Sequence, residues 1–331
     1  MEQIEMNKQL SDKSCALNLR TALSPESRED AVLPSQNRGI TAGSGAPCAK
    51  SSCGGAKLNG VGTYPYIYAL GRIVARFPSL AIEKEFAQAT GRAGKETVGL
   101  TNQKAFHAVL SKRENRYLTR KICWVLTIEG MDTYILQPRD PADFDMLVEA
   151  IRPAPSPMDI DIVVGLRGPI APPEMCNGLT VPIVIFSQIY SFDRDSFLEA
   201  LKEKRPETIS EEEFTAAAEE LFDRIMQLAD NAGATDEHRA LNYLVVRYDA
   251  IYAKTAEMHG RNFSLTAVDV RPSPLSGVRK IVDVIFSYTQ RENDFTEKFF
   301  VRVDVTEEFP FLVKKLSPYY DRLTPEHQGG I

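Results

Sequence analysis

The stretch YIYALGRIVARFPSLAIEKEFAQ, residues 66–88, sets the pattern from which the fold of this chain can be worked out. Residues 66–73 are apolar and rich in β-forming side chains, which predicts a strand. Pro78 and Ser79 then precede a segment whose apolar residues recur at helical spacing, which predicts a helix. The side chains expected on its buried face are Leu80, Phe86 and Ala87. A strand that leads directly into a helix indicates a chain that mixes both kinds of element.

Further local elements are expected after this helix. Residues 101–121 predict a second helix that ends in a basic run, which would either dock an acidic leader peptide or be a solvated helix end. Residues 122–137 predict a β-hairpin whose turn contains Gly130 and whose core face carries Trp124. Asp140 has the features of an N-cap, because a proline and an acidic residue follow it before the apolar positions of another helix.

Two short apolar runs, 160–166 and 181–189, are bounded by Gly and Pro, and we expect them to be interior strands. A helix that carries Phe197 and Leu201 should follow and end before Pro206.

The second half combines helices with strands. Ser210 and Glu213 form a capping-box pair at the start of one helix, and a second helix is expected from near Asp236 through Tyr252. Strands are expected at 263–270, 280–288 and 295–305, and a last helix is expected to be capped at 306–308 and to continue through 312. The predicted fold class is therefore α+β, with mixed helices and short sheets. Its carboxy-terminal half is expected to be a helical hairpin plus an antiparallel three-stranded meander.

Composition changes along the chain predict its domain organisation. The first 60 residues are rich in Ser, Gly, Ala and Pro and contain no aromatic residue, which is typical of a disordered tail or linker. Charge and proline coincide at 202–210, where we place the main internal boundary. The expected parts are a tail at 1–60, an α/β subdomain at 62–205, an α+β subdomain at 208–323 and a short tail at 324–331.

The overall composition is that of an ordinary soluble protein, with 331 residues, 43% hydrophobic, 25% charged and a formal net charge of -6. An acidic chain has no general attraction for phosphate backbones, so nucleic acid is not expected as a partner. We find no apolar run near the roughly 20 residues that span a bilayer and no apolar core of a secretory signal, so we expect a cytoplasmic protein without membrane association. The five cysteines lack framework spacing, so reduced thiols are expected.

Motifs that would carry chemistry are sparse. Cys48 and Cys53 are weak candidate metal ligands, because a structural zinc needs four; they belong to the tail or require ligands from another chain. Residues 91–97 resemble a phosphate loop but lack its first glycine and the Ser or Thr after the lysine. Asp159 and Asp161 would share one strand face, either as cation ligands or as a solubilising strand edge. We therefore expect no metal, no cofactor and no catalytic residue.

The segment RGPIAPPEMCNG, residues 167–178, is the most distinctive loop. Its candidate peptide-binding residues are Arg167, Glu174, Cys176 and Asn177. A cysteine nucleophile needs a partner that lowers its pKa, usually histidine, and the nearby sequence holds none. The alternative is a structural loop, in which prolines stiffen the connection and Cys176 packs as a small apolar residue.

Several strings of this sequence resemble the carboxy-terminal domain of cyanobactin maturation proteases of the PatA and PatG type. They are YIYALGRI, RFPSLAIEKEFAQATGR, ENRYLTRKICWVLTIEG, TYILQPRDPADFDMLVEAIRP and RGPIAPPEMCNG. The resemblance covers about residues 62–323. In that family the domain typically follows a subtilisin-like protease, in a pathway that converts ribosomally made precursor peptides into modified, often macrocyclic products. Because the role of the domain itself is unassigned, the resemblance carries over no catalytic or binding residue.

Subtilisin-like catalysis needs Asp, His and Ser in that chain order, and the residues before Tyr66 contain no His. We therefore do not expect this chain to be a subtilase by itself. The resemblance implies an accessory, non-catalytic protein that binds a precursor peptide, a partner protease or a second copy of itself as a homo-oligomer. The alternative hypothesis is a peptide-modifying enzyme with an unrecognised site around Arg167–Asn177.

Overall fold

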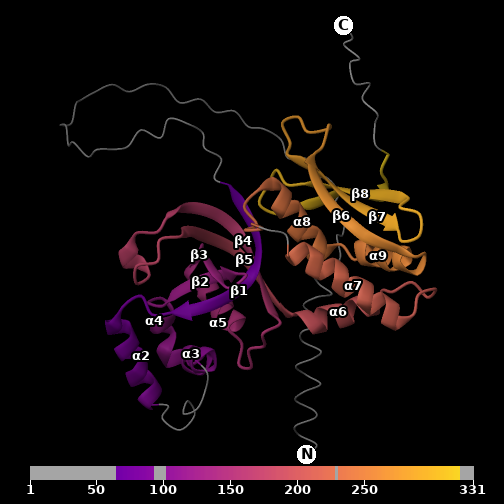
Figure 1. Ribbon diagram of the computed structural model, residues 1–331. Helices are drawn as coiled ribbons and strands as arrows, with labels where there is room; N and C mark the ends of the chain where they lie inside the picture. Colours follow the sequence, from indigo (N-terminus) through magenta and orange to yellow (C-terminus); the bar gives the residue numbers. More distant parts are fainter. Residues whose placement is uncertain (1–64, 93–101, 228–229, 321–331) are drawn as a thin grey trace, which may run out of the picture. The chain divides into compact units, whose positions relative to one another are not determined.

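Strands of the first half close into a barrel in the computed structural model of the protein (Figure 1). The structure describes residues 65–92, 102–227 and 230–320, which all belong to the compact unit Thr63–Ile331. Among these residues the barrel order is β1-β2-β3-β5-β4, in which only β3 and β5 pair in parallel. The strands are β1 (Tyr66–Arg76), β2 (Cys123–Ile128), β3 (Met131–Pro138), β4 (Asp159–Ile170) and β5 (Pro182–Asp193). The sequence predicted these strands but not their closure.

Some predictions concern other parts of the chain. The tails expected at 1–60 and 324–331, together with Cys48 and Cys53, lie outside the described residues, as does most of the segment 91–97.

β1 closes the barrel because it changes partner at Gly71. Residues 66–71 pair with β4, and residues 72–76 pair with β2. A Cβ atom on Gly71 would lie 2.4 Å from a backbone carbonyl oxygen of β2, so a larger residue does not fit there. Gly165 lies at a register shift between β4 and β5, where a Cβ atom would lie 2.4 Å from a carbonyl oxygen of β5. These two glycines allow the strands to bend.

Alternate residues of the barrel strands point inward and form an apolar core. Helices α2 (Leu80–Arg92), α3 (Asn102–Leu110) and α5 (Phe144–Ala150) pack against this core and lie on one side of the barrel in Figure 1. Trp124 is buried within it, in agreement with its predicted place on the core face of the hairpin.

The buried face of α2 differs in part from the prediction. Phe86 is buried, but Leu80 is 63% exposed and Ala87 is exposed. The residues that pack on the core are instead Ile82, Phe86 and Ala89, because positions three and four apart lie on one helix face.

The other helical segments of the first half are short. They are η1 (Arg113–Asn115), α4 (Arg116–Thr119), η2 (Pro141–Asp143), η3 (Pro173–Met175) and α6 (Arg194–Lys202). The helix predicted over 101–121 is thus broken, at a point where the Asn115 side chain donates to the carbonyl oxygen of Val109 (2.9 Å). The predicted N-cap at Asp140 is confirmed, since its carboxylate accepts from a backbone N–H and its own N–H donates to Asp143 (3.1 Å).

The second half is made of helices and an antiparallel sheet of order β6-β7-β8-β9. Its elements are α7 (Glu211–Met226), α8 (Asp236–Arg247), α9 (Ala250–Gly260), β6 (Phe263–Pro272), β7 (Ile281–Gln290), β8 (Thr296–Asp304) and β9 (Phe311–Pro318). The N–H of Glu213 donates to Ser210 Oγ (3.3 Å), as predicted for the start of α7. The α+β class is confirmed. Of the helices in the described residues, none combines the length and the apolar character needed to cross a membrane.

Two predictions in this half are wrong. The helix expected from Asp236 through Tyr252 is two helices, because Tyr248 is extended (φ -127°, ψ 91°) where α8 ends. The helix expected at 306–312 does not form, because Phe311–Pro318 pair with β8 and make the sheet four-stranded rather than three-stranded. Backbone pairing with a distant strand therefore outweighs the local capping signal.

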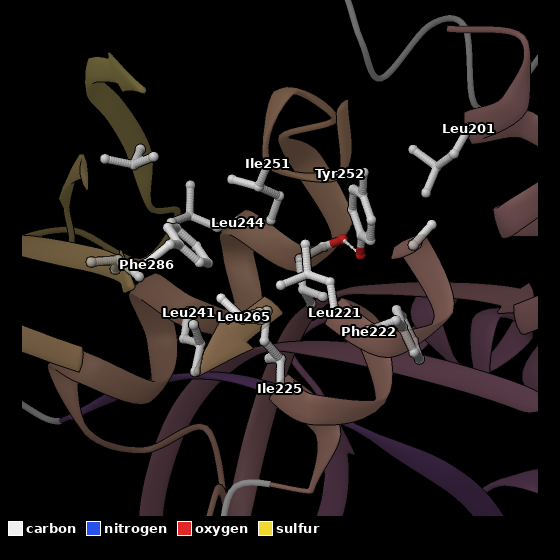
Figure 2. Packing of buried hydrophobic residues seen from close by; sticks show 14 of the residues in the cluster. Leu201, Leu221, Phe222, Ile225, Leu241, Leu244, Ile251, Tyr252, Leu265 and Phe286 are labelled. Carbon is white, nitrogen blue, oxygen red and sulfur yellow. Dashed lines mark hydrogen bonds between the residues drawn. The ribbon is translucent and has the colours of Figure 1, made fainter. Parts of the chain in front are cut away.

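A large apolar cluster lies between the helices and the sheet of this half (Figure 2), and its buried side chains include Phe222, Leu244 and Phe286. The same cluster contains Tyr68 and Ile162 from the outer face of the barrel. It thus includes residues on both sides of the segment at 202–210. The division into two subdomains stays a prediction.

The second half also covers part of β1. The Tyr68 N–H donates to the carbonyl oxygen of Gly233 (2.9 Å), and the Asn242 side chain donates to the carbonyl oxygen of Tyr68 (2.8 Å). The Tyr134 hydroxyl, from β3, donates to the carbonyl oxygen of Ala232 (2.9 Å). The backbone groups of Tyr68, which β2 does not reach, are therefore satisfied by the segment before α8 and by α8 itself.

Candidate functional site

The loop predicted to bind a peptide begins on a strand and ends in a tight turn. β4 continues to Ile170, so Arg167 is a strand residue paired with Val184 of β5. Glu174 lies in the short helix η3. Asn177 has a φ of 48°, in the left-handed region that asparagine tolerates better than most residues. The loop is thus an ordered turn that consists of the end of β4, the helix η3 and a left-handed residue.

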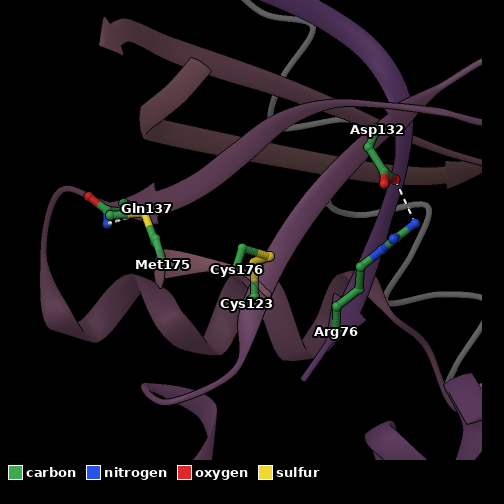
Figure 3. The surroundings of a disulfide bond; sticks show 6 residues. All are labelled: Arg76, Cys123, Asp132, Gln137, Met175 and Cys176. Carbon is green, nitrogen blue, oxygen red and sulfur yellow. Dashed lines mark hydrogen bonds and ion pairs between the residues drawn. A yellow bond between two sulfur atoms is a disulfide. The ribbon is translucent and has the colours of Figure 1, made fainter. Parts of the chain in front are cut away.

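Cys176 of this loop is bonded to Cys123 at the start of β2 (Figure 3). Their Cα atoms are 5.7 Å apart, and both residues are buried. The prediction of reduced thiols is wrong for this pair, because sequence spacing does not show that β2 and the loop lie side by side. In the bonded form Cys176 has no thiol to act as a nucleophile. This removes the one nucleophile of the alternative, enzymatic hypothesis.

The disulfide belongs to a small apolar cluster outside the barrel core. Val125 and Ile183 extend it on the strands, and Ala171 and the half-buried Leu179 extend it in the loop. We call these four residues and the disulfide the loop platform. Met175 packs against the same cluster, and its sulfur lies 3.9 Å from Gln137 Nε2 on β3 (Figure 3). The prediction that Cys176 packs like an apolar residue is therefore correct as to burial.

The candidate peptide-binding residues of the loop do not form one constellation. Arg167, Glu174 and Asn177 are exposed, but no hydrogen bond or ion pair joins them within the described residues. Arg167 lies instead near Tyr134, where its charge opposes the burial that raises the pKa of that tyrosine. Peptide binding by these residues stays a prediction, and buried Cys176 holds the loop in place.

Asp159 and Asp161 have protein partners. Arg152 Nη1 lies 2.6 Å from Asp159 Oδ1. Asp161 accepts from the Ile73 N–H (2.6 Å) and from the Ser191 hydroxyl (2.5 Å). Because Asp161 is only 2% exposed, the strand-edge interpretation is wrong, and burial raises its pKa to about 6 although both hydrogen bonds oppose the shift. Asp161 fastens β1 to β4 and β5 just after β1 changes partner.

A groove that the sequence analysis missed runs past Arg72 of β1. Two adjoining cavities, of about 830 and about 500 Å³, share Arg72, Val74, Gln103 and Pro157 in their walls. Such volumes are typical of ligand sites, which span about 300–1,000 Å³. The larger cavity also reaches the end of α7. The available signal was a charged residue, Arg72, in the middle of an apolar strand pattern.

The described residues show no catalytic metal centre. Within 65–92, 102–227 and 230–320, no three His, Cys, Asp or Glu side chains gather so that they could hold a metal ion.

Residues 208–319 match the family model described as PatG C-terminal. This segment is a PatG C-terminal domain. The predicted resemblance to the PatG-type carboxy-terminal domain is thereby confirmed over this segment. A solved structure described as "PatG Domain of Unknown Function" is similar to this chain with a TM-score of 0.63 and 19% sequence identity, over 77% of this chain and 99% of that chain. At this identity the similarity establishes the fold. None of the curated proteins compared with this chain matches it.

The PatG C-terminal domain comprises α7 to α9 and β6 to β9, whereas the barrel and the loop at 167–178 precede it. The similarity to the solved structure extends further, since 77% of the chain exceeds the matched segment. Both parts build the groove. Arg72 and Gln103 come from before the PatG C-terminal domain, and Asp223 and Met226 come from within it.

Proposed function

We propose that this chain is an accessory binding protein of cyanobactin-like ribosomal peptide maturation, which holds a precursor peptide or the maturation protease without catalysing a reaction. The PatG C-terminal domain at 208–319 supports the pathway, because in the resembling proteases this domain typically follows the catalytic part. The observation that carries the binding role is the groove around Arg72.

The groove has the two kinds of surface that a peptide needs. Val74, Ile128 and Met226 supply apolar wall, and Arg72 and Gln103 supply hydrogen-bond donors. Apolar walls bury peptide side chains, and convergent polar groups pair with the amides that would otherwise lose their water. Two cavities that share a wall can accommodate successive residues of one extended chain.

The test is a titration of the full chain with a precursor peptide and, separately, with a subtilisin-like maturation protease from the same pathway. We expect one of them to bind with a micromolar Kd. Arg72→Gln should weaken that binding about tenfold or more, because a charged hydrogen-bond donor is lost from the groove. Arg116→Gln is the matched control, since Arg116 forms an exposed ion pair with Asp145 on α4 and α5 and does not line either cavity.

Two results would contradict the proposal. The first is the absence of binding to both partners at micromolar concentrations. The second is a change in precursor mass after co-expression with this chain alone, measured by mass spectrometry, because that change would make the chain an enzyme.

A further inference from the structure

The two ends of the groove differ in charge. Arg72 and Lys104 line the smaller cavity, and no carboxylate lies among its described lining residues. Arg72 also lines the larger cavity, where it lies among three carboxylates, those of Glu129, Asp159 and Asp223, and Lys104 lines the smaller cavity only. A ligand that occupies both cavities therefore meets a cationic end and an acidic end.

Protein partners compensate most of the charge at the acidic end. In the larger cavity Asp159 is paired with Arg152 (2.6 Å) and Asp223 with Arg194 (2.8 Å). In the smaller cavity Lys104 forms no ion pair within the part of the chain that the structure describes. Arg72 uses its guanidinium to donate to the carbonyl oxygen of Ser156 (3.2 Å) and forms no ion pair with a carboxylate among the described residues. Counted over the described residues alone, the cationic end thus keeps two charges without a carboxylate partner, which an anion could neutralise.

Apart from Gln103 and Ser156, the rest of the smaller cavity is apolar. Val74 and Ala75 of β1, Phe106 of α3 and two prolines, Pro155 and Pro157, form its other walls. A fully hydrated inorganic anion gains nothing from such walls, whereas a carboxylate attached to an apolar group satisfies both the charges and the walls. The continuation into the larger cavity provides room for a chain that extends away from the carboxylate.

We infer that the smaller cavity binds the free carboxy-terminal end of a peptide whose last side chain is apolar, with the preceding residues in the larger cavity. This inference rests on the proposed function and specifies which end of a peptide the groove holds. Gln103, which lines both cavities, is placed to pair with the last amide of such a chain.

The experiment uses a fluorescent, N-terminally blocked hexapeptide that ends in leucine, prepared once with a free carboxylate and once as the carboxamide. Fluorescence anisotropy with the full chain measures both affinities. We expect the acid to bind about tenfold more tightly than the amide, and the difference to shrink as salt is raised. An amide that carries one internal glutamate distinguishes an acidic side chain from a chain terminus as the source of the carboxylate.

Variants separate the cavity from general charge effects. Lys104→Gln should abolish most of the preference for the acid, and Gln103→Glu should weaken binding of the acid more than binding of the amide. Lys84→Gln is the matched control, because Lys84 is an exposed lysine of α2 that lines neither cavity. Thermal unfolding of each variant establishes that it is folded.

Equal affinities for acid and amide, equal effects of Lys104→Gln and Lys84→Gln, or no binding of either peptide up to about 1 mM would each overturn the inference. Tight binding of the internal-glutamate amide would also overturn it as a claim about the chain terminus. If the precursor or the protease binds while the acid and amide peptides have equal affinities, the inference fails and the proposed function stands. If the acid is preferred while neither larger partner binds, the cavity assignment stands and the proposed function fails.

Discussion

Removal of the bond between Cys123 and Cys176 should measurably destabilise the chain. The bond joins the start of β2 to the loop after β4, across a sequence separation of 53 residues. Without the bond, only non-covalent contacts hold the loop against Val125 and Ile183 of the loop platform. The perturbation is Cys123→Ala, Cys176→Ala, or both.

The magnitude follows from the length of chain that the bond closes. In the chain-entropy model, a loop closed across the 53-residue separation raises the free energy of unfolding by about 4 kcal/mol. Measured effects of native disulfides typically fall between about 2 and 4 kcal/mol, so we expect a loss in that range. With an m-value of about 3 kcal/mol/M in urea, the unfolding midpoint should fall by about 1 M.

The assay is urea unfolding of the wild type with and without a reductant, and of the three variants. Each single variant should lose about as much as the double variant, because either one breaks the bond and the effects are not additive. Cys48→Ser is the control and should leave the midpoint unchanged. A thiol titration in urea should find three reactive cysteines of the five before reduction and all five afterwards. A midpoint insensitive to reductant, or five reactive thiols without reduction, would refute the reasoning.

Three further predictions concern buried residues, in the barrel, in the second half and between the two. Burial raises the pKa of Asp161 from 3.8 to about 6, so its contribution to stability is complete only well below pH 3.8 and is lost as pH rises through 6. The free energy of unfolding of the wild type should therefore fall by about 2 kcal/mol more than that of Asp161→Asn between pH 4 and 7 in urea titrations. Gly233 has a φ of 68°, and a Cβ atom there would lie 2.4 Å from the Tyr68 carbonyl oxygen. Gly233→Ala should therefore lower the free energy of unfolding by about 2 kcal/mol or more. An unchanged melting temperature would contradict this prediction. Arg239 is buried and donates to the carbonyl oxygens of Val305, Glu307 and Glu308. Arg239→Leu should therefore lower the free energy of unfolding by about 3 kcal/mol in urea unfolding. A loss below about 1 kcal/mol would show that water satisfies those carbonyls.

The elements that sequence predicted correctly are those set by neighbouring residues. Asp140 caps its helix with its own carboxylate, and Ser210 pairs with Glu213 three residues later, so each signal is complete within a few positions. The hairpin at 122–137 is equally local, because its turn at Glu129 and Gly130 joins strands that pair directly.

The wrong or missed predictions concern features that residues far apart in the sequence determine. Phe311–Pro318 contain no decisive local strand signal, and they become β9 because β8 offers a backbone edge. Barrel closure depends on β1 changing partner at Gly71, and the sequence marks that position only as a glycine inside a strand. The disulfide depends on the same tertiary arrangement, which brings Cys123 to Cys176.

The candidate site likewise combines features with a local sequence signal and features that only the tertiary structure brings together. The loop at 167–178 stood out by its prolines and cysteine, which turn out to shape and fix the loop through the bond to Cys123. The groove did not stand out, because Arg72, Lys104 and Asp223 are far apart in the sequence and each has an ordinary local role. Only the charge of Arg72 within an apolar strand pointed to it.

The closed barrel also limits how this chain can hold a peptide. Many domains bind an extended peptide by adding it as a strand to a free sheet edge, so that backbone hydrogen bonds supply affinity and side chains matter less. In the barrel that route is closed, because β1 to β5 pair in a ring and the groups of Tyr68 that β2 does not reach are taken by Gly233 and Asn242. A peptide in the groove must therefore be held by side chains such as Arg72 and Lys104. Recognition of that kind would be sensitive to single substitutions and to the chemistry of the chain end, so the comparison of acid and amide peptides should test it directly.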